Sequence, residues 1–193
     1  MKNVKRIDYA SFPLVIIGDT HGFIDDFQKQ KEVLQTIHPK FVLVELLENK
    51  QCNSFGEYRS LLQKESLSPV LQKLLAFCVQ ENIKAIGLDL KHFGLNSRLQ
   101  DIVNNKTLPT KEDNEHLERI LKKRQKHHIS MIKRYLTKTK SLVVILGAWH
   151  LQEYSPLMKA FAHYLAIFPC DTKGRLLLRP PKNGKVRYSF KQK

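Results

Sequence analysis

Two histidines follow a glycine at the same spacing in this chain. His21 ends the sequence Gly-Asp-Thr-His at 18–21, and His150 ends Gly-Ala-Trp-His at 147–150. Each motif comes after an aliphatic run, which is typical of a strand buried on both faces of a parallel sheet. The histidines are therefore expected at the carboxyl edge of the sheet, where open α/β folds bind ligands and metals. A core or loop histidine with its hydrogen bonds satisfied is the alternative reading of each.

Two carboxylates stand at the ends of the intervening apolar runs. Glu45 interrupts the run 41–47, where an unpaired buried carboxylate would be costly unless a metal, a histidine or an arginine relieved it. Asp89 ends the run 85–88 in the same manner. Both residues are expected to join the histidines at one sheet edge. The alternatives are that Glu45 faces solvent from an edge strand and that Asp89 only caps a loop.

A long predicted helix adds two basic side chains to this group. Steps of three and four residues from Leu117 to Tyr135 trace one apolar face, and Arg124 and His128 fall on it. Charge on the buried side of a helix suggests contact with the site. The alternative is that Arg124 extends outward from the helix into solvent.

The elements that must position these residues alternate between buried strands and helices, which predicts an α/β fold with a mainly parallel sheet of four or more strands flanked by helices. Strands are expected at 14–18, 41–46, 83–90 and 142–146, and a loop at 91–113. Helices are expected after the first strand and at 55–62, 69–82, 112–139 and 155–165. Asn183-Gly184 favours a C-terminal β-hairpin within 174–191.

Composition narrows the class of protein. The 193 residues, 42% hydrophobic and 26% charged, predict one folded domain over 1–193. No stretch approaches the ~20 apolar residues of a membrane span, and no secretory signal is evident, so a cytoplasmic location is expected. Three widely spaced cysteines argue against a disulfide framework or a zinc ribbon. The net charge of +15 allows a nucleic-acid partner, although a lysine-rich solvated surface is the favoured explanation.

The order of these motifs resembles the TraB family. That family belongs to a wider grouping of TraB and PrgY proteins, Tiki proteases, erythromycin esterases and ChaN haem-binding proteins. The resemblance spans residues 14–152 and implies an α/β fold with a hydrolase-like site that cleaves a peptide or a small-molecule ester. Carried over by position, His21, Glu45 and His150 match the family's two motif histidines and the glutamate of its second strand.

This ligand set predicts one divalent metal, Zn²⁺, Mn²⁺ or Co²⁺, held by His21, Glu45 and His150, with Asp89 as a further ligand. A metal-bound water would be the nucleophile. Arg124 or His128 would stabilise a developing oxyanion, so the predicted catalytic residues are Glu45, Arg124 and His128. A metal-free variant uses Glu45 and His21 as a general acid and base pair.

Other classes remain open. A non-enzymatic module could bind haem, as the ChaN resemblance implies, or nucleic acid. Residues 18–22 also resemble the opening motif of calcineurin-like metallophosphatases, but the later Gly-Asn-His motif of those enzymes is absent from the chain.

Overall fold

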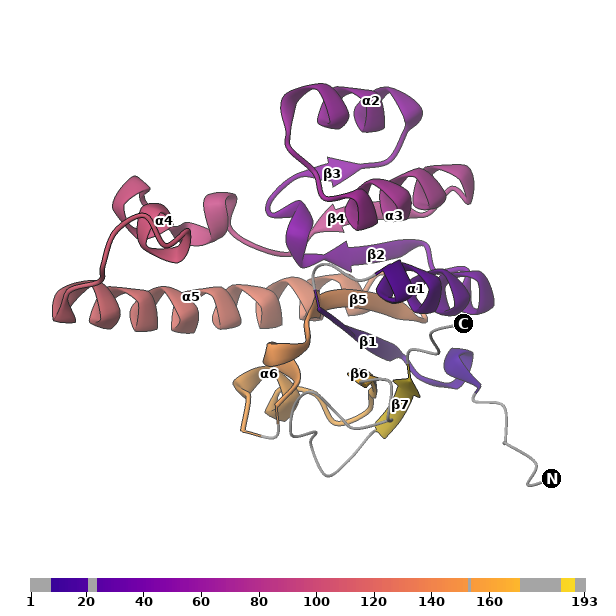
Figure 1. The fold of residues 1–193 in the computed structure, drawn as a ribbon. Coiled ribbons are helices and arrows are strands. Elements are labelled where there is room, and N and C mark those ends of the chain that lie inside the picture. Colours follow the sequence, from indigo (N-terminus) through magenta and orange to yellow (C-terminus); the bar gives the residue numbers. More distant parts are fainter. Residues whose placement is uncertain (1–7, 21–23, 153, 171–184, 190–193) are drawn as a thin grey trace.

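The computed structural model describes residues 8–20, 24–152, 154–170 and 185–189 (Figure 1). Its centre is a seven-stranded sheet with the strand order β3-β4-β2-β5-β1-β6-β7. Parallel pairing links all neighbours except β3 and β4, which are antiparallel. The strands are β1 (Leu14–Asp19), β2 (Phe41–Val44), β3 (Gln51–Cys52), β4 (Lys84–Gly87), β5 (Leu142–Gly147), β6 (Leu165–Cys170) and β7 (Lys185–Ser189). The predicted α/β class with a mainly parallel sheet is confirmed.

Helices cover both faces of this sheet (Figure 1). They are α1 (Ile24–Ile37), α2 (Phe55–Lys64), α3 (Pro69–Gln80), α4 (Ser97–Val103), α5 (Lys111–Leu136) and α6 (Pro156–Lys159). Short 3₁₀ turns are η1 (Tyr9–Ser11), η2 (Glu45–Leu47), η3 (Lys91–Gly94) and η4 (Ala148–Leu151). No helix of the described ranges is both long and apolar enough to cross a membrane.

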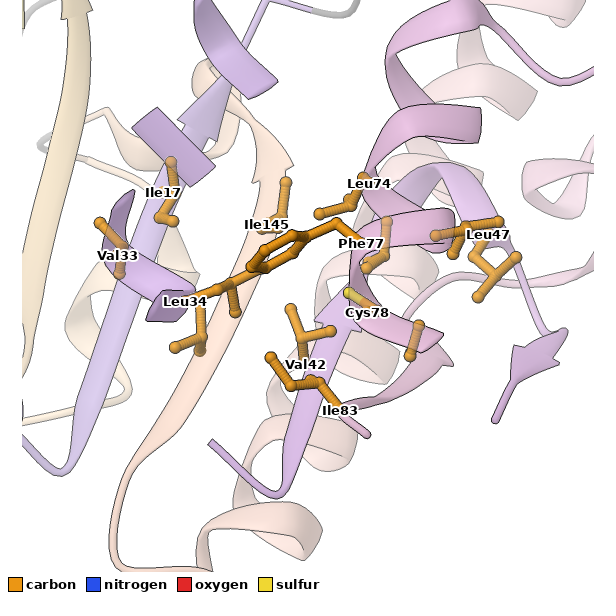
Figure 2. Close-up of a cluster of buried hydrophobic side chains, with 14 of the residues drawn as sticks. Ile17, Val33, Leu34, Val42, Leu47, Leu74, Phe77, Cys78, Ile83 and Ile145 are labelled. Carbon is orange, nitrogen blue, oxygen red and sulfur yellow. The ribbon is translucent and has the colours of Figure 1, made fainter. Parts of the chain in front are cut away.

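Alternate residues of the central strands build two separate cores, because successive side chains of a strand point to opposite faces. One core packs Ile17, Val42 and Ile145 against α1 and α3 (Figure 2). The other packs Ile16, Leu43 and Val144 against α5 and α6. All six residues of β1 and of β5 are buried, as their uninterrupted aliphatic runs predict. Cys52 and Cys78 are buried free thiols.

Several predicted boundaries are wrong. The expected helix 155–165 is only the four residues of α6, and the apolar run from Leu165 to Phe168 belongs to β6 because it is buried beside β1. The expected loop 91–113 contains α4, whose N-cap Asn96 accepts a hydrogen bond from the Leu99 amide.

The C-terminal hairpin is described in part. Its predicted first arm, 175–179, lies outside the described residues. The predicted second arm corresponds to β7, which pairs in parallel with β6.

Candidate functional site

Strands β4, β2, β5 and β1 are consecutive in the sheet, so their carboxyl ends meet at one edge. Glu45 begins η2 directly after β2, Asp89 follows β4 by two residues, and His150 lies in η4 directly after β5. All three side chains are buried. Helix α5 contributes Arg124 and His128 from its inner face. The structure therefore brings together five of the six predicted site residues, while His21 lies outside the described residues.

Glu45 is the centre of this cluster. Its Oε2 accepts a hydrogen bond from the Gly147 amide at 2.5 Å, and its Oε1 lies 2.6 Å from Arg124 Nη2 and 3.2 Å from His150 Nε2. Because β2 lies between β4 and β5, it is not an edge strand, and the alternative of a solvent-facing Glu45 is wrong. The run of apolar residues around Glu45 marks its burial, as the sequence predicted.

Asp89 is held by the same arginine. Arg124 donates from Nε to both carboxylate oxygens, at 3.1 and 2.9 Å, and from Nη2 to Oδ2 at 2.5 Å. Asp89 Oδ1 also accepts from the Leu90 amide, so part of its role is to cap a turn. Arg124 thus joins two buried carboxylates that come from different strands. Its side chain is 14% exposed, which excludes the alternative of an outward arginine.

The two imidazoles lie beside this ion-pair network. His128 is wholly buried, with Nε2 3.1 Å from Asp89 Oδ2, although that contact is poorly aligned for a hydrogen bond. The His128 and His150 rings meet edge to face, with centroids 5.3 Å apart. Within the described part of the chain, Nδ1 of both histidines is buried and without a hydrogen-bond partner. Two buried imidazole nitrogens therefore have no hydrogen-bond partner among the described residues.

Loop geometry that sequence reasoning missed holds these groups in place. Glu48, at φ 52° and ψ −121°, ends η2, and its carbonyl accepts from the Asp89 amide at 2.9 Å. A Cβ on Gly87 would lie 2.0 Å from that carbonyl oxygen, so only glycine permits the approach. Phe93, at φ 53°, places its ring 5.1 Å from the Arg124 guanidinium carbon. Strain of this kind is concentrated at functional sites in other proteins.

The electrostatics favour ionised carboxylates. Burial alone would raise the pKa of Glu45, but His150, the Gly147 amide and Arg124 outweigh it and lower the pKa to about 2. Burial likewise acts against ionised Asp89, and contacts with His128 and Arg124 hold its pKa well below the usual range. The site therefore contains two negative carboxylates and one fixed guanidinium at neutral pH.

A second acidic pair lies at the end of β1, one strand beyond β5. Asp19 is in register with Gly147, and its Oδ2 accepts from Gln30 Nε2 at 3.1 Å. Asp26 accepts from the Thr20 amide at 3.0 Å. Burial, opposed by the Thr20 hydrogen bonds and reinforced by Asp19, raises the pKa of Asp26 to about 6. Asp26 and Gln30 carried no signal in the sequence beyond their place on the predicted first helix.

Glu45, Asp89 and His128 form a candidate metal-binding triad, because each offers a ligand atom and these atoms lie within 4.8 Å of one another. This set differs from the predicted ligands, since it includes His128 from the helix. Two carboxylates and an imidazole suit Zn²⁺ or Mn²⁺ in their chemistry. However, Arg124 already bonds to both carboxylates, and in this arrangement a divalent ion fits only if the guanidinium moves away.

Comparisons with known proteins support the fold. Neither the protein-family models nor the curated proteins contain a match to this chain. Among solved structures, the type III effector HopBA1 is similar with a TM-score of 0.57 and 16% identity over 94% of this chain and 88% of that one. ChaN of Campylobacter jejuni, solved with cofacially bound haem, is similar with a TM-score of 0.54 and 13% identity over 82% of this chain and 81% of that one. At these identities, the likeness concerns the fold alone.

Proposed function

We propose that this protein is a hydrolase of ester or peptide bonds whose site is the cluster of Glu45, Asp89, Arg124, His128 and His150. The single observation that carries the proposal is the buried Glu45–His150 pair, whose glutamate Oε1 lies 3.2 Å from Nε2 while Nδ1 of the histidine has no partner in the described structure. A carboxylate that fixes one imidazole nitrogen and leaves the other without a partner is the arrangement of a general base.

His150 takes and returns the proton in this proposal. Because Glu45 is ionised, it stabilises the tautomer of His150 that carries its proton on Nε2. The lone pair is then on Nδ1, which can accept a proton from the attacking water. When the imidazole becomes charged, the same carboxylate stabilises it. His150 can afterwards donate the proton to the leaving group.

Arg124 supplies the positive charge for the developing oxyanion. Its Nε and Nη2 are held by Asp89 and Glu45, and no described residue accepts a hydrogen bond from Nη1. A guanidinium fixed on one side by two carboxylates requires little reorganisation when the substrate carbonyl gains charge on the other side. Asp89 is thus a positioning residue for Arg124, and His128 contacts that positioning carboxylate.

The test is a panel of chromogenic carboxylic esters, quenched-fluorescence peptides and a phosphate ester as the substrate for a phosphatase. Glu45→Gln, His150→Gln and Arg124→Lys each remove one function with little change in size. We expect carboxylic ester or peptide turnover by the wild type, with losses of about 10²–10⁴-fold in the first two variants and about 10²–10³-fold in the third. His116→Gln, at an exposed position of α5, the helix that contains Arg124, is the matched control.

Three outcomes would contradict the proposal. Turnover that survives unchanged in Glu45→Gln and His150→Gln would place the chemistry elsewhere. Hydrolysis of the phosphate ester alone would assign the phosphatase class. No turnover, together with a visible haem absorption band lost in His150→Gln, would favour the haem-binding module. Metal analysis of tag-free protein and assays with a chelator decide the metal question, because a metal enzyme loses its activity and regains it on adding Zn²⁺ or Mn²⁺.

A further inference from the structure

The outer face of α5 carries two groups of positive charge, at 119–126 and at 133–134. We define the α5 basic stripe as these six exposed cations, which are Arg119, Lys122, Lys123, Lys126, Lys133 and Arg134. Spacings of three, four and seven residues place them on the side of the helix opposite Arg124 and His128, with Ser130 between the two groups. At about 1.5 Å per residue, the stripe runs for about 22 Å.

These charges are uncompensated. The chain has no Asp or Glu from residue 119 to residue 140. Within the described part of the molecule, no carboxylate lies within ion-pair distance of any of the six side chains. The acidic residues Glu112, Glu115 and Glu118 are confined to the first turns of α5. Like charges three and four residues apart on a helix repel one another, so the stripe costs stability that a bound polyanion would restore.

We propose that the α5 basic stripe binds the phosphate backbone of double-stranded nucleic acid without sequence preference. The row of cations is opposite in charge to a row of phosphates. The other exposed residues between 119 and 134 are Leu121 and Ser130, so no exposed aromatic ring is present there on which unpaired bases could stack, which favours a duplex over a single strand. Leu121 lies on the side of the helix away from the stripe, so no exposed apolar side chain accompanies the cations into a lipid surface, which disfavours an amphipathic membrane helix.

This binding site is separate from the proposed hydrolase site. Arg124 and His128 belong to the inner face of α5, whereas the stripe belongs to its outer face. Substitutions in the stripe are therefore expected to weaken duplex binding and to leave ester or peptide turnover unchanged. This separation lets the two proposals fail independently.

The experiment measures fluorescence anisotropy of labelled RNA and DNA duplexes of about 20 base pairs over a range of salt, because phosphate contacts make affinity salt-dependent. One triple variant carries Lys122→Gln, Lys123→Gln and Lys126→Gln. The matched control carries Lys64→Gln, Lys73→Gln and Lys84→Gln, which are exposed lysines of α2, α3 and β4. Both variants lose three charges, so they differ only in where the charge is removed.

We expect wild-type binding whose log affinity falls with log salt at a slope of about −5, and a slope less negative by about 3 in the stripe variant. At about 100 mM salt, the stripe variant should bind at least about 100-fold more weakly, while the control stays close to the wild type. Equal weakening in both variants would reduce the effect to diffuse net charge and overturn the proposal. Binding to anionic phosphatidylserine vesicles but not to either duplex would also overturn it.

Discussion

The inner and outer faces of α5 carry the same kind of charge in opposite surroundings. On the inner face, Arg124 contacts two buried carboxylates, and His128 is wholly buried beside one of them. On the outer face, the six cations of the α5 basic stripe have no ion-pair partner among the described residues. A count of basic residues does not distinguish these two groups. Their position relative to the apolar face of the helix does, because inner cations contact buried carboxylates and outer cations face solvent.

Replacement of one cation on each face should give the largest contrast. Arg124→Met leaves Glu45 and Asp89 buried without their shared cation, and we expect a loss of about 3–5 kcal/mol in the free energy of unfolding. Lys123→Met, one residue earlier on the outer face, should change it by no more than about 0.5 kcal/mol. Denaturant unfolding monitored by circular dichroism measures both values.

The Arg124→Met variant has a second signature. Without the guanidinium, at least one carboxylate gains by taking up a proton, so mild acid should restore part of the lost stability. Equal losses from Arg124→Met and Lys123→Met, or a loss in Arg124→Met that does not depend on pH, would show that the inner ion pairs contribute little.

A fall in pH should reduce the free energy of unfolding through the contacts of the inner face. The carboxylates that Arg124 contacts there, Glu45 and Asp89, both have lowered pKa values. The pKa of Glu45 is about 2 in the folded protein, below its ordinary value of 4.5. Its contribution to stability is therefore present above about pH 4.5 and is lost as the pH falls toward 2. We expect this residue to account for roughly 3 kcal/mol of the acid lability.

Urea unfolding of the wild type and of Glu45→Gln across this pH range measures that contribution. The variant should show a shallower decline, with the remaining slope coming in part from Asp89. Glu118→Gln, at an exposed position on α5, is the control and should follow the wild type. Parallel curves for Glu45→Gln and the wild type would mean that the Glu45 carboxylate has an ordinary pKa.

Sequence patterns were sufficient for the parts of this site that depend on periodicity. The burial of Glu45 follows from the apolar residues around it, and the inward position of Arg124 follows from the phase of the helix. Both features are local in sequence, so no knowledge of distant contacts is needed. The same holds for the fully buried strands β1 and β5.

The remaining features depend on contacts between distant segments. Gly87 must be glycine because the Glu48 carbonyl approaches it, and Phe93 stacks on an arginine from another element. Neither contact leaves a periodic signal. The candidate metal-binding triad includes His128 because Nε2 of this α5 residue lies 3.1 Å from Asp89 Oδ2, which spacing alone does not determine. Strand β6 was missed because a short apolar run fits a helix and a strand equally.

The smallest expected effect concerns repulsion among the cations of the outer face, which should lower the free energy of unfolding in the absence of a bound duplex. Lys123→Glu removes repulsion with Arg119 and Lys126 and places a glutamate three residues before Lys126, with no acidic residue three or four positions away. We expect the free energy of unfolding to increase by about 0.5 kcal/mol at low salt, and the increase to shrink as salt screens the charges. The same substitution should weaken duplex binding more than Lys123→Gln does, because it adds a negative charge beside the phosphates. Thermal unfolding and anisotropy on the same samples measure both effects. A variant that is more stable yet binds as the wild type does would show that these cations are not arranged for a polyanion.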